Sequence, residues 1–347
     1  MSRYFPLSRL ARPVATPGDA GMGSARYACI LLLLLVIAPQ AGAYPVFVLK
    51  ILCFALFAAA FNLLIGFTGL LSFGHAALFG GAGYAAGYAM QAWGVTSELG
   101  LLIGVLVGAL IGLLMGAIAI RRQGIYFSMI TLALAQMFFF VCLQAPVTGG
   151  EDGLQGIPRG ALFGVLALSN DMTFYYVALA IFSLAFALIM RIVHSPFGQM
   201  LKAIKENEAR AVSLGFDANR FKLLAFVLSA ALAGLAGAMK ALVLGFETLT
   251  DVHWTMSGTV ILMTLVGGMG TLAGPIVGAF VIVILENKLG EIGTGLANLT
   301  GVEWFASLGE SVTLVTGFIF ILCVLTFRRG FMGEIQGLLQ KRAARPD

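Results

Sequence analysis

The stretch from Leu99 to Arg122 reads LGLLIGVLVGALIGLLMGAIAIRR and is uncharged until its closing pair of arginines. An α-helix needs about 20 apolar residues to cross a bilayer, and arginines are enriched in loops on the cytoplasmic side of membrane proteins. This stretch therefore predicts a transmembrane helix that ends in the cytoplasm. One of its faces is expected to form a groove against another helix, because every fourth residue is glycine, at Gly104, Gly108, Gly112 and Gly116.

The composition of the whole chain is that of a helical membrane protein. Hydrophobic residues make up 60% of the 347 positions and charged residues 11%, whereas soluble domains carry about 25% charged residues. This balance excludes a soluble enzyme. The four cysteines stand singly within apolar runs, which excludes a disulfide scaffold and a CxxC redox or metal motif.

Other apolar runs predict further transmembrane helices, at residues 126–143, 173–190, 223–245 and 311–327. The run at 28–43 is shorter and ends in Ala41-Gly42-Ala43, which also fits a signal-peptide cleavage site. We expect this run to remain uncleaved as the first transmembrane helix, because further spans follow it almost directly. Cleavage as a signal peptide is the alternative. The helix over 223–245 is the expected partner of the glycine groove, since it has small residues at four-residue spacing, at Ser229, Ala233 and Gly237 and at Ala230, Gly234 and Ala238.

The positions of the basic residues predict the orientation. If both termini, Arg121–Arg122 and residues 191–222 are cytoplasmic, they hold 17 of the 21 lysines and arginines, as the positive-inside rule requires. The net charge of +5 is then a signal of topology, and nucleic acid is not an expected partner.

This orientation requires two regions to cross an even number of times. Residues 46–92 are expected to form two helices that meet near Gly66–Gly69, and residues 254–288 two short or re-entrant helices that break at Gly267–Gly270. Non-helical backbone inside a membrane needs protein or water around it, so both breaks are candidate pathway positions. The predicted fold is an all-α polytopic membrane protein with about ten membrane elements and both termini cytoplasmic.

The predicted organisation has three parts. A basic cytoplasmic arm at residues 1–26 precedes a transmembrane domain at 27–327, and a basic cytoplasmic tail follows at 328–347. Within the domain we expect a cytoplasmic loop at 194–222 and periplasmic loops at 144–172, 246–253 and 288–310.

Two buried polar residues leave alternatives open. An ionisable residue inside a membrane segment is a functional candidate by default, but His75 can equally be a neutral, purely structural histidine that is hydrogen-bonded to a neighbouring helix, with Ser72 or a backbone carbonyl as its partner. Asn62 can line a pathway or bridge helices. Lys240 lies near the outer end of its predicted helix and can extend to the interface, so no role is assigned to it.

The cytoplasmic loop is the main polar stretch between the termini. Residues Met200 to Leu214 predict one amphipathic helix, which Gly215 can end in the left-handed conformation. We interpret the helix as a docking surface. A helix lying on membrane lipid is the alternative, although Glu206, Glu208 and Asp217 interrupt its basic residues.

Several motifs together resemble the ABC importer permeases for branched-chain amino acids. They are AIKENEARAVSLG at 203–215 with RFKLLAFVLSA at 220–230, NLLIGFTG at 62–69, LSFGHAA at 71–77, TGGEDGLQGIP at 148–158 and GGMGTLAGP at 267–275. The resemblance runs from about Asn62 to Arg328, and its strength lies in the shared order and spacing of the motifs.

The resemblance implies a transport subunit in the bacterial cytoplasmic (inner) membrane, with no catalytic residue, bound cofactor or metal of its own. ATP and Mg²⁺ would be used by partner ATPases, either two copies or one of each of two types, and the chain has no GxxxxGK[ST] phosphate loop. The other implied partners are a second related permease, a periplasmic substrate-binding protein and membrane lipid. Relatives also carry urea, short amides or other amino acids, so these remain alternative substrates.

The resemblance also implies two groups of site residues. Expected ATPase-coupling residues are Lys202, Glu206, Asn207, Glu208, Arg210, Ala211 and Gly215, although Glu208-Ala209-Arg210 departs from the family's usual Glu-Ala-Ala. Translocation-pathway candidates are Asn62, Gly66, Gly69, Ser72, Gly74, His75, Gly267, Gly268, Gly270, Gly274 and Pro275.

Two other classes of protein are alternatives to this interpretation. A stand-alone channel or secondary transporter would also show glycine breaks, but it needs no long structured inner loop and favours acidic residues inside the membrane for ion coupling. A membrane-embedded enzyme needs a catalytic cluster, whereas His75, His194 and His253 lie in different predicted elements.

Overall fold

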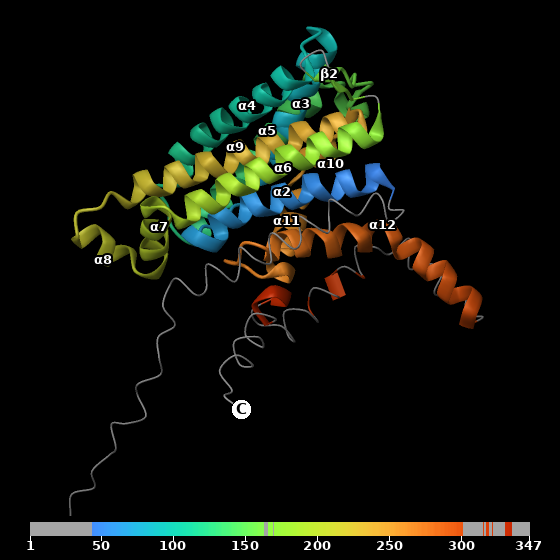
Figure 1. The fold of residues 1–347 in the computed structure, drawn as a ribbon. Helices are drawn as coiled ribbons and strands as arrows, with labels where there is room; N and C mark the ends of the chain where they lie inside the picture. The colour runs from blue at the N-terminus through green and yellow to red at the C-terminus, as the bar shows by residue number, and fades with distance from the viewer. Residues whose placement is uncertain are drawn as a thin grey trace, which may run out of the picture.

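The computed structural model describes residues 44–162, 166–168 and 170–300, together with 315, 317, 318, 321 and 330–334. These residues form a bundle of α-helices, shown in Figure 1. The helices are α2 (Pro45–Thr68), α3 (His75–Ala92), α4 (Ser97–Ala119), α5 (Ile125–Gln144), α6 (Asp171–His194), α7 (Pro196–Glu206), α8 (Glu208–Ser213), α9 (Ala218–Leu244), α10 (Leu249–Val252), α11 (Trp254–Gly267) and α12 (Gly274–Thr300).

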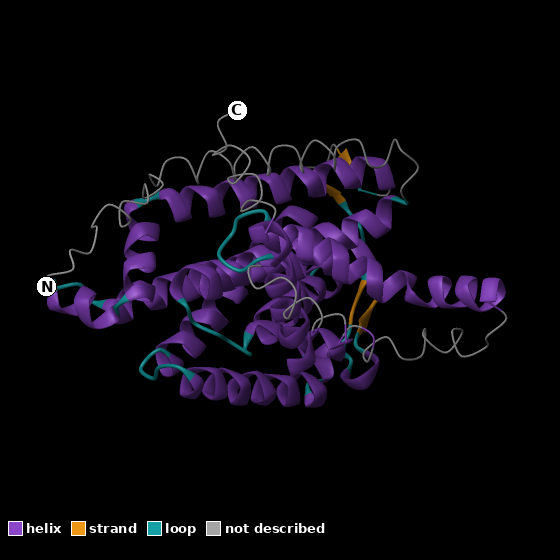
Figure 2. Cartoon of the chain, turned by 90° about the horizontal axis from the view of Figure 1, so that it is seen from below, coloured by secondary structure: helices purple, strands orange, loops and turns teal. Residues whose placement is uncertain are grey.

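The little strand structure, drawn in orange in Figure 2, lies at the end of the bundle opposite α7 and α8 (Figure 1). β1 (Leu154–Gln155) pairs antiparallel with β4 (Phe246–Glu247), and β2 (Ala161–Leu162) pairs antiparallel with β3 (Leu166–Ala167). Two 3₁₀ turns, Pro146–Thr148 and Gly150–Asp152, lead into β1. The two 3₁₀ turns and β1 to β3 connect α5 to α6, and β4 follows α9.

Five of the described helices, α2, α4, α5, α6 and α9, are long and apolar enough to cross a membrane. Four of them coincide with the predicted apolar runs, and α2 is the first of the two helices expected over residues 46–92. An all-α polytopic membrane fold is confirmed at this level. The predicted first helix at 28–43 lies outside the described residues. The predicted span at 311–327 lies largely outside them.

The centre of the bundle is α2. It is apolar on every face, as is typical of a helix that is buried in a core or a membrane, and nearly all of it is buried inside the bundle. Helices α6, α9, α11 and α12 pack around it, as Figure 1 shows for the blue helix between α6 and α12. In contrast, α4 and α5 leave large apolar side chains exposed, among them Leu106, Leu110, Met137 and Phe140, as expected for surfaces that face lipid.

The predicted glycine groove is confirmed, because α4 packs closely against α9. A Cβ atom placed on Gly108 would lie 2.7 Å from the carbonyl oxygen of Ala230 and 2.9 Å from the Cα of Gly234. A Cβ on Gly104 would lie 2.5 Å from the Cβ of Ala238. The contact thus uses the small residues of α9 at 230, 234 and 238, and only glycine on α4 permits it.

Both predicted interruptions are present. α2 ends at Thr68, and α3 begins at His75 after a non-helical stretch. α11 is a 14-residue helix that ends at Gly267, and α12 begins at Gly274.

α12 continues past residue 288, the predicted start of a periplasmic loop, and ends at Thr300, so the first part of this segment is helical. Charged residues from Glu286 onward end an apolar run, but they do not end a helix. No proline follows Pro275 within α12 to interrupt its hydrogen bonds.

Candidate functional site

The predicted single helix over Met200–Leu214 is wrong, because the chain forms two helices there, α7 and α8, which are separated by Asn207. Asn207 has an extended backbone, and its side chain accepts a hydrogen bond from the Arg210 N–H at 3.0 Å. Asparagine is a favoured N-cap because its side chain can bond a free N–H of the first turn. In this structure Asn207 therefore caps α8, a local role that its position in an amphipathic pattern did not reveal.

The α7–α8 segment, residues 196–213, is anchored to the bundle by apolar and ionic contacts. Leu201 and Ile204 on α7 and Ala211 on α8 are buried. Glu208 accepts a hydrogen bond from the Lys222 ammonium of α9 at 2.6 Å. The predicted coupling residue Glu208 is thus already paired within its own chain, and its contact fixes α8 on α9.

The outer surface of the α7–α8 segment is open and polar. Glu206, Arg210 and Gly215 are exposed, and Gly215 has a φ of +89°, which confirms its predicted left-handed conformation. A groove of about 210 Å³ separates the two helices; its lining residues are Met200, Ala203, Glu206, Asn207, Arg210, Ala211, Leu214 and Phe216. The predicted coupling residue Lys202 lies outside this groove, with its ammonium 5.7 Å from the centre of the Phe67 ring.

Asn62 joins α2 to the break between α11 and α12. Its side-chain oxygen accepts from the Gly270 N–H at 2.9 Å, and its amide nitrogen donates to the Thr271 carbonyl at 2.8 Å. Thr271 closes the turn, since its hydroxyl donates to the Gly268 carbonyl and accepts from the Gly274 N–H. The structure therefore brings together the pathway candidates of two distant motifs, at Asn62, Gly66, Gly267, Gly268, Gly270, Gly274 and Pro275.

Backbone N–H and carbonyl groups in the break between α2 and α3 form hydrogen bonds with hydroxyl groups of other helices. Ser128 on α5 donates to the Leu71 carbonyl at 2.6 Å, and Thr131 accepts from the Phe73 N–H at 3.2 Å. Ser257 on α11 donates to the Phe73 carbonyl and accepts from the Ala76 N–H. Backbone groups in a membrane need such partners.

Of the candidates in this break, Ser72 and Gly74 lie within the network of hydroxyl groups, whereas Gly69 caps the end of α2 beside the Lys205 side chain. Ser72 is buried, and its hydroxyl accepts from the Gly74 N–H at 3.1 Å. Ser128, Thr131 and Ser257 were not among the site residues predicted from the sequence. The feature that could have indicated them is that each is a hydroxyl residue within an apolar run.

His75 is fully buried and bonds to Ser229 of α9, not to Ser72. Its Nε2 lies 3.0 Å from the Ser229 Oγ, whose own proton is donated to the Ala60 carbonyl at 2.6 Å. Since a hydroxyl has only one proton to donate, the Ser229 oxygen accepts this bond, and the His75 Nε2 carries the proton. In this conformation His75 links α3 to α9, which is the structural alternative raised for it.

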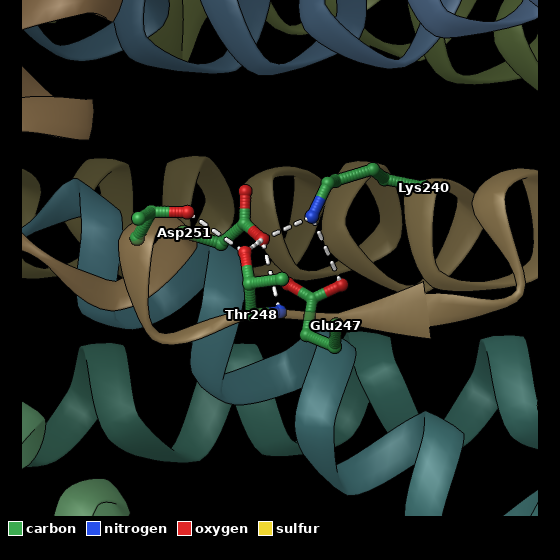
Figure 3. Close-up of polar contacts among 5 residues, drawn as sticks. Lys240, Glu247, Thr248 and Asp251 are labelled. Carbon is green, nitrogen blue, oxygen red and sulfur yellow. Dashed lines mark hydrogen bonds and ion pairs between the residues drawn. The ribbon is translucent and has the colours of Figure 1, made fainter. Parts of the chain in front are cut away.

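The expectation that Lys240 extends to the interface is wrong. Its ammonium is buried and forms ion pairs with Glu247 of β4, at 3.2 Å, and with Asp251 of α10 (Figure 3). The Thr248 hydroxyl donates to the same Asp251 oxygen at 2.7 Å. The chain turns back after Gly245 and places both acids over the end of α9. This reversal could not be predicted from the spacing of the charged residues in the sequence.

Glu247 is the least satisfied member of this charged cluster. It is completely buried, and its Oε1 has no hydrogen-bond partner within the described part of the chain. Burial raises the pKa of the Glu247 carboxyl well above its usual value, and the Lys240 charge opposes this shift. Gly83 of α3 lies directly against the carboxylate, so the cluster joins α9, α10 and α3.

Comparison with known proteins places these features in a family. A family model described as "branched-chain amino acid transport system / permease component" matches residues 46–325. The high-affinity branched-chain amino acid transport system permease protein LivM of Escherichia coli is 27% identical over 246 residues, which cover 64% of this chain and 58% of that protein. LivM of Salmonella typhimurium is 28% identical over 258 residues with the same coverage.

A third relative is the autoinducer 2 import system permease protein LsrC of Klebsiella pneumoniae, 30% identical over 148 residues, or 41% of this chain and 40% of that protein. The chain aligns with little more than half the length of the two LivM proteins. No solved structure is significantly similar to it. Because the family model covers most of the chain, including α2 to α12, the chain belongs to the permease-component family of branched-chain amino acid transport systems.

Proposed function

We propose that this chain is the transmembrane permease subunit of an ATP-driven ABC importer in the bacterial inner membrane, and that it forms part of the translocation pathway for branched-chain amino acids. The observation that carries the proposal is the family match across residues 46–325. The arrangement of the α7–α8 segment supports it, since this segment is anchored on α9 and α2 yet leaves a polar surface exposed.

The proposed topology has about ten membrane elements with both termini in the cytoplasm, and it places the α7–α8 segment on the cytoplasmic side. The concentration of lysine and arginine at that end supports the orientation. The opposite end, with β1, β4 and α10, would then face the periplasm. The chain would be a transport subunit rather than an enzyme, with ATP and Mg²⁺ bound by separate ATPase subunits.

The proposed partners are the other subunits that such an importer requires. Two ATPases, or one of each of two types, would contact the exposed α7–α8 surface around Glu206, Arg210 and Gly215. A second related permease would complete the membrane dimer, and a periplasmic binding protein would deliver the substrate. Closure of the ATPases on ATP would move the α7–α8 segment and so reorient the helices around the breaks at 69–74 and 268–273.

Branched-chain amino acids are favoured as substrate because the LivM relatives align with 64% of the chain, whereas the LsrC relative aligns with 41%. Urea, short amides and other amino acids are the alternatives. The test is uptake into proteoliposomes that contain the complete complex and its binding protein, with radiolabelled leucine and urea as competing substrates and ATP inside the vesicles.

The expected result is ATP-dependent accumulation of leucine that excess isoleucine or valine reduces and excess urea does not. Accumulation of urea in preference to leucine would overturn the substrate assignment. Leucine uptake that persists without ATP would overturn the importer mechanism itself.

A further inference from the structure

Lys205 of α7 reaches the end of α2. Its ammonium donates a hydrogen bond to the Gly66 carbonyl at 2.7 Å. Gly66 is in the last turn of α2, where carbonyl groups lack a partner within the helix. A cation at the C-terminal end of a helix is also favoured by the helix dipole. The contact therefore joins a charged donor to an acceptor that needs one.

The stem of Lys205 lies across the turn that ends α2. A Cβ atom on Gly69, which has a φ of +75°, would lie 3.2 Å from the Lys205 Cγ. One turn earlier on α7, the Lys202 ammonium lies over the Phe67 ring. Two lysines on one side of α7 thus contact the same end of α2, but only Lys205 bonds to its backbone.

Gly66 in turn contacts the break between α11 and α12. A Cβ on Gly66 would lie 2.9 Å from the Gly270 nitrogen. Asn62, one turn before Gly66, forms two hydrogen bonds through its side-chain amide, one with Gly270 and one with Thr271. The Gly66 peptide therefore lies between the Lys205 ammonium and the turn at 268–273. A continuous set of contacts leads from α7 through α2 to this turn.

We propose that Lys205 is the positioning residue through which the α7–α8 segment holds the α11–α12 break in place during transport. This inference deepens the proposed function and rests on it, because it assigns to Lys205 the transmission of movement from the ATPase side to a pathway element. Lys205 is distinct from the residues expected to touch the ATPase. It acts on the break only through Gly66 and Asn62.

The first test measures amide hydrogen exchange by mass spectrometry on the full chain in detergent, and it does not depend on transport. In Lys205→Met the amides of Gly268, Gly270, Thr271 and Gly274 should exchange about tenfold faster, since a hydrogen bond to a charged group is lost. Lys205→Arg should keep exchange within about twofold of the wild type, because the guanidinium restores the charge and donors.

The matched control is Lys202→Met, which removes a lysine from the same helix but no backbone bond to α2. It should leave exchange at residues 268–274 unchanged. Equal acceleration in Lys202→Met and Lys205→Met would overturn the proposal, because the effect would then be general loosening of α7. Unchanged exchange in Lys205→Met would overturn it as well. If Lys205→Met does not fold, Lys205→Gln provides the same comparison.

The second test measures leucine uptake and ATP hydrolysis in the reconstituted complex. Lys205→Met should assemble and hydrolyse ATP but take up about tenfold less leucine per ATP, and Lys205→Arg should restore most of the ratio. An unchanged ratio in Lys205→Met would overturn the proposal. If the wild-type complex transports no leucine, the proposed function fails, and the exchange experiment still decides whether Lys205 holds the break.

Discussion

Lys240, Glu247 and Asp251 place one positive and two negative groups in the interior of the bundle. All three side chains are almost completely buried. Removing one partner of a buried ion pair leaves an uncompensated charge and costs about 3–5 kcal/mol. The two acids are not equivalent, because Asp251 also bonds to Thr248, whereas one oxygen of Glu247 has no partner in the described structure.

Lys240→Met is therefore expected to lower the stability of the protein far more than Glu247→Gln. The lysine variant leaves two buried carboxylates without a cation, at a cost of about 3–5 kcal/mol. The glutamine variant resembles the protonated form of Glu247 that burial favours. Thermal unfolding of the purified protein in detergent measures both. Equal loss of stability in the two variants would show that Lys240 does not neutralise this cluster.

At the scale of elements, two features of the sequence predict packing well. The four-residue spacing of glycine on α4 predicted a groove, and the structure places Ala230 and Gly234 of α9 in it. The glycine-rich motifs predicted where α2 and α11 end. In both cases the signal is local, because a missing Cβ determines how closely backbones approach.

Gly108→Leu should separate α4 from α9. Even the first side-chain carbon would lie 2.7 Å from the Ala230 carbonyl, and overpacking of this kind typically costs about 1–3 kcal/mol or more. The control is Gly258→Leu on α11, where a Cβ meets no atom within 4 Å. Normal thermal stability and normal assembly in Gly108→Leu would contradict the packing described here.

Gly215→Val tests the turn that follows α8. Gly215 has a φ of +89°, which a β-branched residue adopts only with strain, so the α7–α8 segment should be displaced on α9. We expect leucine uptake per ATP to fall about tenfold or more, since about 1–3 kcal/mol of backbone strain would act on this segment. Gly215→Asn is the control, because asparagine tolerates the left-handed region. If both variants couple ATP hydrolysis to uptake like the wild type, the conformation of Gly215 has no part in coupling.

For the molecule as a whole, the fold class and the five described helices that are long enough to cross a membrane could be predicted from the sequence, but the contacts between distant segments could not. Lys240 illustrates the limit. Its partners follow a chain reversal at Gly245, and only the folded chain shows that they lie beside it. Lys205 was missed for the same reason, since its acceptor is a backbone carbonyl 139 residues away. Asn207 was misassigned because capping depends on a break that an amphipathic pattern does not show.

If this chain works as one subunit of an ABC importer, as proposed, it should form a stable complex with other subunits. The most direct measurement is to tag the full chain in its native membrane, solubilise it in mild detergent and identify the proteins that co-purify with it. We expect ATPase subunits of one or two types and a second permease of the same family. A chain that purifies alone, or only with further copies of itself, would contradict the account and favour a stand-alone channel or secondary transporter.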